Sequence, residues 1–527
     1  MKKSLVLVMV LILSQLSFAS MEPARAGSTW YVSPSGSGTL CTQASPCEIG
    51  SCVQTKAAWG DTILAKEGTY KANDPSSQYL LYIYKSLTII GSCKFEATGP
   101  VSCDMSRMTS ILDGETDRRV IAVQGIAGNG LNVYIGGFYI MRGNANGMGP
   151  ANCMSGYAGT AQDCGGGIYS ENVDQLILQH NYIWANTASD STDPDDVSLG
   201  GGLYVDNSKY VMLSDNTIIF NNAANQGYGH GGGMFISNSG KPGGILLMNN
   251  TFYNNEIGQN RIGTGAGLLS FNNSDLHLLQ NKFEYQNFFQ KKLLPGSAIM
   301  LRGATGVTLT QNKFTQNEGS STISIIGDMG SITGVMEQNK FWYNPSAIMI
   351  EIFGDVTMRM VNNFFGRVPE FTRSNNTLLD LKGSEVLGTP YLDILHNTFV
   401  GAGYGIKAHE HTSINVNRNI FVSFSERAIE ITSPATTTYT INENLFNWNT
   451  HNGYSGTNSY SGNPHFVDIS NGDLHIMTGS AAIDKVSGGS LFMDIDSQLR
   501  PIGIAPVNFD VGADEYMVQI FMPIIFN

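Results

Sequence analysis

The chain has 527 residues, with 30 Lys and Arg against 43 Asp and Glu, and a formal net charge of −13. This acidic balance argues against nucleic acid and anionic lipid as partners, because binding to phosphate depends on clusters of Lys and Arg. Charged residues make up only 14% of the chain and glycine is abundant at 60 residues, which favours an extended β architecture over a surface of charged helices.

Residues 1–26 have the pattern of a secretory signal peptide. Two lysines precede an apolar run, and small residues at Ala24 and Ala26 are spaced as a signal peptidase reads them. We expect cleavage after Ala26, with Ala19 as the second choice. The alternative is an uncleaved membrane anchor, although the run is shorter than the ~20 residues that span a bilayer. No later segment is apolar enough to span, so the protein is expected to be secreted, extracellular or on the cell surface.

The cysteines all lie in the first third of the chain, at Cys41, Cys47, Cys52, Cys93, Cys103, Cys153 and Cys164. In an exported protein such cysteines are read as disulfides. The local pairs Cys93–Cys103 and Cys153–Cys164 would each close a loop, and we predict that both form. Two of the first three are expected to pair in a combination left open, so one cysteine stays free or pairs between chains. A zinc site is the alternative, but the spacing lacks a CxxC and companion histidines.

A repeated unit, Asn-x-Phe or Asn-x-Ile, runs through the middle of the chain. Its asparagines are Asn181, Asn216, Asn250, Asn281, Asn312, Asn339, Asn362, Asn397, Asn419 and Asn444. The intervals vary above a floor of about 22 residues, as expected for a solenoid in which each turn is one repeat and loops of different length are inserted at a corner.

Each unit has an earlier half in which glycines introduce an apolar alternation. Examples are GGGIYSEN at 165–172, GGGLYVDN at 200–207 and GGGMFISN at 231–238. The period of two predicts strands, and the Gly and Asn between them predict tight turns. Three short strands per turn, stacked in parallel, predict an all-β fold, a right-handed parallel β-helix with a disulfide-bearing N-terminal cap and a C-terminal cap.

The Gln-Asn-Lys-Phe sequence, which occurs three times, can be interpreted within this fold. If each Asn of the unit closes the same corner, the amides form a ladder and the residues two positions later fill the bore. That inner column would be Ile183, Ile218, Phe252, Phe283, Phe314, Phe341, Phe364, Phe399, Phe421 and Phe446. Lys282, Lys313 and Lys340 fall between Asn and Phe and should point outward to solvent.

The glycine-led segments and the FxxN pieces, such as Phe252-Tyr-Asn-Asn255, resemble the repeats of the pectin-lyase-like superfamily and of polymorphic outer-membrane proteins. The N-terminal TWYVSPSGSG segment and Gly60-Asp61-Thr62-Ile63 resemble the start of many secreted β-helices. Residues 463–516, from NPHFVDISNGD to DVGADEY, resemble the choice-of-anchor Q domain found on secreted bacterial β-helix proteins. These resemblances imply fold and location more than activity, because this fold hosts lyases, hydrolases and adhesins.

The resulting domain plan has five parts. We expect a signal peptide at 1–26, an N-terminal cap with the first coils at 27–120, the β-helix repeats at 121–450, the choice-of-anchor Q-like region at 451–516, and a short apolar tail at 517–527. The tail has no sortase motif and no length to span a membrane, and is interpreted as a last strand or cap.

Two outward columns of the glycine-led strands are candidate site residues. Tyr169, Tyr204 and Phe235 would form an aromatic platform on which sugar rings could stack, unless inserted loops fold over them, which we favour because exposed apolar stripes are a liability. Glu171 and Asp206 would face each other on adjacent coils. Carboxylates about 5 Å apart suit glycoside cleavage and raise one pKa, as a general acid requires. Full hydration or a calcium ion are the other ways to stabilise the pair.

The loop SDSTDPDDVS at 189–198 carries Asp193, Asp195 and Asp196. Oxygen-rich loops can bind calcium, but the spacing is not that of an EF-hand, so a solvated acidic loop is the simpler interpretation. No other cofactor is implied.

The expected function is therefore non-catalytic. We expect an exported β-helix protein that presents a face and loops to a polysaccharide or a surface protein. The alternative is a polysaccharide lyase or glycoside hydrolase that uses Glu171 and Asp206. Lyase and polygalacturonase signatures known for this fold are absent from the sequence.

Overall fold

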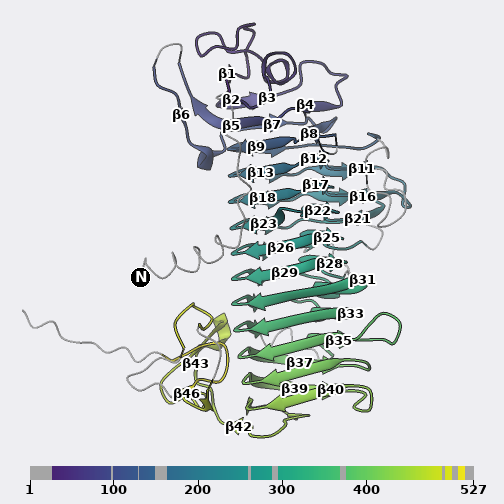
Figure 1. Cartoon of the computed structure of the whole chain (residues 1–527), viewed down its shortest axis with the longest axis vertical. Coiled ribbons are helices and arrows are strands. Elements are labelled where there is room, and N and C mark those ends of the chain that lie inside the picture. The colour runs from purple at the N-terminus through teal and green to yellow at the C-terminus, as the bar shows by residue number, and fades with distance from the viewer. Residues whose placement is uncertain are drawn as a thin grey trace, which may run out of the picture.

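The computed structural model describes residues 27–96, 99–126, 128, 130–148, 153, 163–258, 263–287, 295–367, 375–488, 493–500 and 508–516. The expected signal peptide and the tail 517–527 lie outside the described residues. Within the described part, the main strands join into one 37-stranded sheet wound into stacked coils (Figure 1). This is a right-handed parallel β-helix, as the sequence predicted.

Each coil contributes one strand to each of three parallel faces, A, B and C, in that order along the chain. Face A contains β4 (Tyr79–Ile83), β8 (Arg119–Gln124), β12 (Ile168–Glu171), β17 (Leu203–Asp206), β22 (Met234–Ser237), β25 (Leu268–Phe271), β28 (Ile299–Arg302), the first parts of β31 (Ser321–Glu337) and β33 (Ile348–Val361), β35 (Thr377–Lys382), and the last parts of β37 (Thr398–Ala408) and β39 (Ile420–Ile431).

Face B follows face A in each coil. It contains β1 (Thr29–Val32), β2 (Asp61–Lys66), β5 (Leu87–Lys94), β9 (Asn132–Gly136), β13 (Gln175–Gln179), β18 (Tyr210–Ser214), β23 (Gly244–Met248), β26 (Ser274–Leu279), β29 (Thr305–Thr310), the last parts of β31 and β33, β36 (Tyr391–Leu395), β38 (Ser413–Asn417) and β40 (Thr438–Asn442).

Face C closes each coil with very short strands. It contains β3 (Gly68–Tyr70), β7 (Ser110–Asp113), β10 (Phe138–Met141), β14 (Tyr182–Trp184), β19 (Thr217–Ile219), β24 (Thr251–Tyr253), β27 (Lys282–Glu284), β30 (Lys313–Thr315), β32 (Lys340–Trp342), β34 (Phe364–Gly366), the first parts of β37 and β39, β41 (Leu445–Asn447) and β42 (Tyr460–Ser461).

The remaining elements decorate this core. Beside face A lies a small parallel sheet of β11 (Asp163–Cys164), β16 (Val197–Leu199) and β21 (Tyr228–His230), and β15 (Thr187–Ser189) pairs with β20 (Asn222–Ala224). Short elements near the N-terminus are α2 (Ile49–Ser51), η1 (Cys52–Lys56), β6 (Ser102–Cys103) and η2 (Met105–Arg107). The C-terminal part has β43 (Phe466–Asp468), η5 (Ile469–Asn471), β44 (Asp473–Ile476), β45 (Val486–Ser487) and β46 (Asn508–Phe509).

The asparagine ladder runs along the corner between faces B and C. Asn312 shows the pattern: its Oδ1 accepts hydrogen bonds from the backbone N and the Nδ2 of Asn281 at 2.9 and 3.1 Å, and its Nδ2 donates to Leu278 O at 2.8 Å and to Asn339 Oδ1 at 3.0 Å. Each amide thus satisfies backbone groups of the turn and binds the next coil, as predicted.

The aromatic column fills the bore beside this ladder. Phe314 is fully buried and stacks on Phe283 and Phe341, with ring centroids 5.3 and 4.5 Å apart. One rung differs from the predicted series: Asn363, not Asn362, accepts from Asn339, and Phe365, not Phe364, stacks in the bore. The sequence Asn-Asn-Phe-Phe fits both registers, and the predicted one was wrong by a single residue.

The other two side chains of the Gln-Asn-Lys-Phe unit face outward. Gln280, Gln311 and Gln338 adopt positive φ near 57° at the corner, and their amides form an outer chain in which Gln280 donates to Gln311 at 2.8 Å and Gln311 to Gln338 at 3.1 Å. Lys282 and Lys313 point to solvent as predicted, whereas Lys340 reaches Asp496 at 3.3 Å.

A second ladder, which the sequence analysis does not predict, runs along the corner after face C. The asparagines three positions after the bore residue bond from coil to coil: Asn221 Nδ2 donates to Asn255 Oδ1 at 3.1 Å, and Asn317 Nδ2 donates to Asn344 Oδ1 at 2.9 Å. Both corners that flank face C are therefore fixed by buried amides.

Three disulfides form among the described residues. Cys93–Cys103 and Cys153–Cys164 are the two predicted pairs, and Cys41–Cys47 is the third. Cys52 is the free cysteine, and it is buried.

The described parts of the C-terminal region, residues 463–488, 493–500 and 508–516, lie beside the last coils (Figure 1) and pack on the outer side of face C. Leu474, Ile476, Val486, Phe509 and Val511 form one apolar cluster with the outward residues of face C, which are Phe364, Val400, Ile420, Val422 and Leu445. Burial of these residues joins the region to the β-helix.

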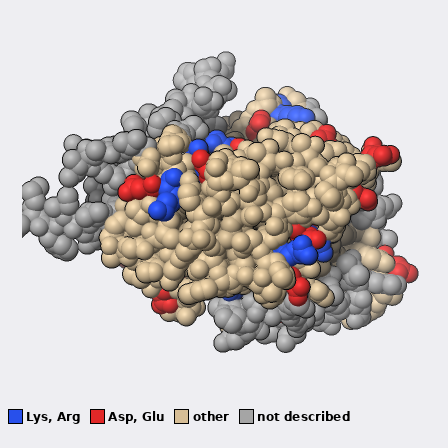
Figure 2. Space-filling view, turned by 90° about the horizontal axis from the view of Figure 1, so that it is seen from below, with Lys and Arg blue, Asp and Glu red and all other residues tan. Residues whose placement is uncertain are grey.

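Charged side chains are sparse at the end of the molecule seen in Figure 2, where blue and red groups often lie close together. No helix among the described residues is long and apolar enough to cross a membrane.

Candidate functional site

The two predicted carboxylates lie opposite each other. Glu171 in β12 pairs in register with Asp206 in β17, and both are half-buried. Neutral donors hold them: the Tyr169 hydroxyl donates to Glu171 at 2.6 Å, and Asp206 accepts from Ser237 Oγ at 2.6 Å and Asn238 Nδ2 at 2.9 Å. The strand register places the two carboxylates opposite each other, and these hydrogen bonds stabilise the negative charge of each one.

The predicted aromatic platform is not exposed. Tyr169 is 2% exposed, and Tyr204 and Phe235 are 0% exposed, although they do stack along face A with centroids 5.4 and 5.6 Å apart. They pack in a cluster with Cys164 and Leu199, from β11 and β16, which lie beside face A in Figure 1. These strands cover the rings, as the favoured alternative expected, so Tyr169, Tyr204 and Phe235 are not open to stack on sugar rings.

The acidic loop does not gather its carboxylates. Asp193 Oδ1 accepts a hydrogen bond from the backbone N of Asp195 at 2.9 Å, which folds the loop on itself. Among the described residues, groups of three or more metal-capable donors occur at two places, and neither includes Asp193, Asp195 or Asp196. The convergence that a calcium site needs is therefore not formed here.

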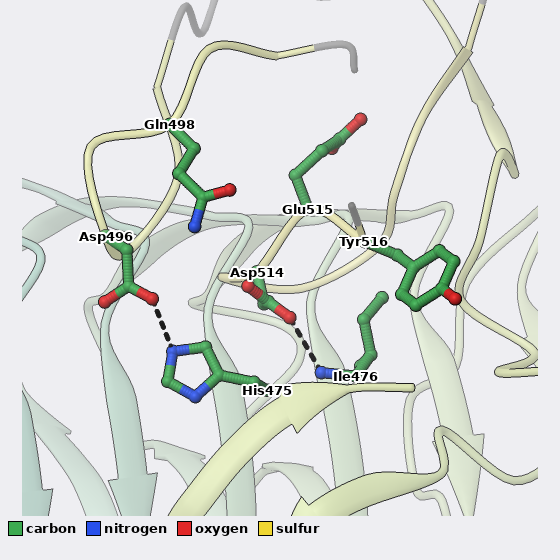
Figure 3. Close-up of a pocket in the computed structure, with 7 residues that line it drawn as sticks. All are labelled: His475, Ile476, Asp496, Gln498, Asp514, Glu515 and Tyr516. Atoms are coloured by element: carbon green, nitrogen blue, oxygen red, sulfur yellow. Dashed lines mark hydrogen bonds and ion pairs between the residues drawn. The ribbon is translucent and has the colours of Figure 1, made fainter. Parts of the chain in front are cut away.

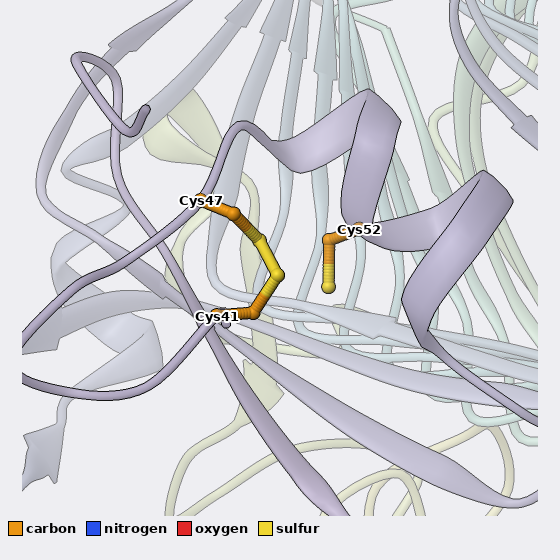
Figure 4. Close-up of side chains that lie close together, drawn as sticks. All are labelled: Cys41, Cys47 and Cys52. Atoms are coloured by element: carbon orange, nitrogen blue, oxygen red, sulfur yellow. A yellow bond between two sulfur atoms is a disulfide. The ribbon is translucent and has the colours of Figure 1, made fainter. Parts of the chain in front are cut away.

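One of those two places is the sulfur group of the N-terminal cap (Figure 4). The sulfur atoms of Cys41, Cys47 and Cys52 lie within 4.8 Å of one another, but Cys41 and Cys47 are bonded to each other. Burial raises the pKa of the Cys52 thiol to about 12, so it stays protonated and is a poor nucleophile or ligand. The group therefore consists of a structural disulfide and a buried thiol.

A partly exposed aromatic surface lies on face C instead, and we call it the aromatic strip. It consists of Tyr139, Tyr182, Trp184, Phe220, Tyr253 and Tyr285. Tyr139 and Tyr182 stack with centroids 4.7 Å apart, and Trp184 meets Tyr139 edge-on at 6.0 Å. Two coils further along, Tyr253 contacts Phe220 at 5.8 Å and Tyr285 at 5.2 Å.

The backbone turns two of these rings outward. Phe220 and Tyr285 occupy the corner after face C with φ of 54° and 57°, the left-handed conformation that Ala185 and Asn254 also adopt at this corner in neighbouring coils. Phe220 is 44% exposed. The corner thus turns these two rings outward and away from the bore.

The sequence contained the signal for this strip. In Asn-Tyr-Ile-Trp at 181–184, the bore residue Ile183 is flanked by Tyr182 and Trp184, and Phe252 is flanked by Tyr253 in the same way. The predicted site residues all lie on the glycine-led strands of face A or in the loop at 189–198, whereas these aromatic residues lie on the shorter strands of face C.

A second feature, which the sequence analysis does not predict, is a pocket of about 260 Å³ in the C-terminal region (Figure 3). Its lining residues are His475, Ile476, Asp496, Gln498, Asp514, Glu515 and Tyr516. They come from β44 and from the two segments 494–498 and 514–516, which only the tertiary structure brings together.

Electrostatic contacts in this pocket are strong. His475 Nδ1 contacts Asp473 Oδ1, and its Nε2 lies 2.7 Å from Asp496 Oδ2. Burial alone would lower the pKa of His475, but the bonds to Asp496 and Asp473 outweigh it and raise the pKa to about 9. Burial raises the pKa of Asp514 to about 6, against the hydrogen bond from Ile476 N, which lowers it.

The family model described as a right handed beta helix region matches residues 126–283. Among solved structures, the pectate lyase Pel9A is 11% identical, with 94% of this chain and 97% of that chain covered and a TM-score of 0.34. The GH136 lacto-N-biosidase from Eubacterium ramulus is 9% identical, with 80% and 67% covered and a TM-score of 0.24. No curated protein matches the chain.

Proposed function

We propose that this protein is an exported, non-catalytic β-helix that binds a polysaccharide chain along the aromatic strip of face C. The observation that carries the proposal is the row of partly exposed rings from Tyr139 to Tyr285 across successive coils. Exposed aromatic side chains gathered along one face of a protein are typical of an interaction site.

The shape of the strip favours a glycan over a protein partner. The strands β14, β19 and β24 have three residues each, and their central residues point into the bore. Only two side chains per strand therefore face outward, so the surface is narrow and runs along the β-helix axis with a spacing of about 4.8 Å per coil. A narrow, linear surface suits an extended chain of sugar rings, whereas a stable protein interface buries about 800 Å² per partner.

The strip offers partners for both the apolar surface and the hydroxyl groups of a sugar. The rings offer apolar surface and the tyrosines add hydroxyl groups that can hydrogen-bond to sugar hydroxyls. Further along face C, Glu284 and Lys313 form an ion pair at 3.7 Å, which provides charged hydrogen-bonding groups next to the strip.

Export is supported by the disulfides, which persist in oxidising compartments. The signal peptide at 1–26 remains part of the proposal, as does the assignment of residues 463–516 to the choice-of-anchor Q domain. Amino-terminal sequencing of the protein recovered outside an expressing cell should begin at Gly27; retention of Met1 on cell-associated protein would contradict export with cleavage.

The binding test uses the mature chain on a polysaccharide panel, by affinity electrophoresis and glycan array. Trp184→Ala and Tyr253→Ala should each weaken binding by about fivefold or more, because removing one stacked ring costs about 1 to 3 kcal/mol. Tyr391→Ala is the matched control, since Tyr391 is 43% exposed on face B and lies outside the strip. Circular dichroism verifies that each variant is folded.

Two results would overturn the proposal. One is unchanged glycan binding in both strip variants, or no retention of any polysaccharide. The other is turnover of a polysaccharide, followed through reducing ends and unsaturated ends, that Glu171→Gln or Asp206→Asn abolishes. The second result would establish the alternative, a lyase or hydrolase acting at the carboxylate pair.

A further inference from the structure

We infer that His475, Asp496 and Asp514 form a binding site for a divalent transition-metal ion of the Zn²⁺ type in the pocket of the C-terminal region. This inference is independent of glycan binding, because the pocket lies in residues 473–516 and uses no residue of the aromatic strip.

The donor atoms are already gathered. His475, Asp496 and Asp514 each offer one ligand atom, and these atoms lie within 4.8 Å of one another. Nitrogen and oxygen ligands lie about 2.0 to 2.2 Å from zinc, so ligands of one ion are about 3 to 4 Å apart. Small side-chain rotations would bring the three atoms to that distance.

The orientation of the imidazole points independently to a metal. Asp473, which is not one of the three donors, contacts Nδ1 of His475. The Nε2 atom consequently faces Asp496, with Asp514 beside it in the pocket (Figure 3). Histidine ligands almost always have their second ring nitrogen bonded to a carboxylate or carbonyl group, which fixes the ring and raises its basicity.

Asp514 also has a vacant acceptor atom. The residue is 6% exposed, and its Oδ2 accepts a hydrogen bond from Ile476 N at 2.7 Å. Within the described residues, Oδ1 receives no hydrogen bond, although it belongs to a carboxyl group that lines the pocket. A cation beside a carboxylate this buried stabilises its charged form.

The surrounding charge is favourable for a dication. Asp473, Asp496, Asp514 and Glu515 are close together, whereas Lys340 contacts Asp496 from outside at 3.3 Å and Arg500 contacts Glu515 at 3.3 Å. One imidazole with two carboxylates matches zinc ligation, and it does not match calcium, which takes 6 to 8 oxygen ligands. The pocket of about 260 Å³ leaves room for a water molecule as a fourth ligand.

Such an ion would hold three segments together. His475 is on β44, Asp496 follows a bridge at Met493, and Asp514 precedes the last described residues. Because the ion binds only when these segments are folded together, it should stabilise the C-terminal region against face C.

The experiment uses the full mature chain, stripped with EDTA and dialysed into metal-free buffer. Titration calorimetry with ZnCl₂ should show one site per chain, and saturating Zn²⁺ should raise the melting temperature. Asp496→Asn and Asp514→Asn should each weaken Zn²⁺ binding by at least tenfold. The control Asp484→Asn, which removes an exposed carboxylate outside the pocket, should bind like wild type.

A measurement on the wild type keeps the test informative if a variant fails to fold. Anomalous diffraction at the zinc edge, from crystals soaked in ZnCl₂, should place the ion between the three side chains. The inference is overturned by an absence of Zn²⁺ binding at 1 mM metal, by an ion at another position, by equal affinity in both pocket variants, or by CaCl₂ binding in preference to ZnCl₂.

Discussion

At the scale of single residues, the burial of His230 makes the stability of the folded protein depend on pH. This histidine ends β21, is 7% exposed, and its Nδ1 lies 3.0 Å from Thr264 Oγ1. Burial lowers its pKa from 6.5 to about 4, so the ring is neutral in the folded protein over most of the pH range.

The sign of the pH effect follows from that shift. Above about pH 6.5 the ring is neutral in both the folded and the unfolded chain, and it contributes no pH dependence. Between about pH 6.5 and 4, only the unfolded chain takes up the proton, so the free energy of unfolding should fall by up to about 3 kcal/mol. Urea unfolding of wild type and His230→Gln at several pH values measures this: the advantage of wild type should shrink across the window. If the free energies of unfolding of wild type and His230→Gln changed with pH in parallel, the lowered pKa of His230 would be contradicted.

At the scale of elements, the stacked column and its ladder make each coil depend on the next. Face C strands are only a few residues long and are stable because Asn amides fix both of their corners and aromatic rings fill the space between them. Repetition predicted this column from sequence. A local ambiguity at Asn362 and Asn363 could not be resolved, because two adjacent Asn-x-Phe readings have the same pattern and only stacking in the bore selects between them.

Phe314→Ala tests the column. The substitution should lower the free energy of unfolding by about 3 to 5 kcal/mol, because it leaves a cavity between Phe283 and Phe341. The measurement is the shift of the denaturant midpoint. Lys313→Ala, which changes the exposed neighbour of the same coil, should alter stability by less than about 1 kcal/mol. Equal stability of both variants would contradict the register.

At the scale of the whole molecule, Arg500 joins the C-terminal region to the β-helix. Its side chain is 0% exposed and contacts Asn362 Oδ1 at 3.3 Å, His396 Nδ1 at 3.2 Å and Glu515 Oε2 at 3.3 Å. Asn362, displaced from the ladder by Asn363, thus contacts the C-terminal region, and Phe364 packs in the same interface. Asn362 and Phe364, which do not follow the repeat, are therefore residues that contact the C-terminal region.

Arg500→Met should loosen this interface. The change leaves the buried Glu515 carboxylate without its cation, at a cost of about 3 to 5 kcal/mol. Hydrogen exchange in β44 and proteolysis within 463–516 should accelerate, while exchange in the coils of face A stays as in wild type. Arg359→Met is the control, because that side chain is 42% exposed and pairs with Asp393 at the surface. Unchanged exchange in β44 would show that the region is held by its apolar contacts alone.

The sequence by itself determined the parallel β-helix, the inward and outward sides of its strands, and two disulfide pairs, because these depend on local periodicity and on short loops that repetition makes visible. Tertiary structure alone decided which outward residues reach solvent. Tyr204 and Trp184 are both outward aromatic residues, but inserted strands cover the first on face A. The second lies on face C, where the described part of the C-terminal region packs against the last coils. The pocket of His475, Asp496 and Asp514 likewise depends on three segments that no sequence spacing connects, because burial and convergence are set by contacts between distant parts of the chain.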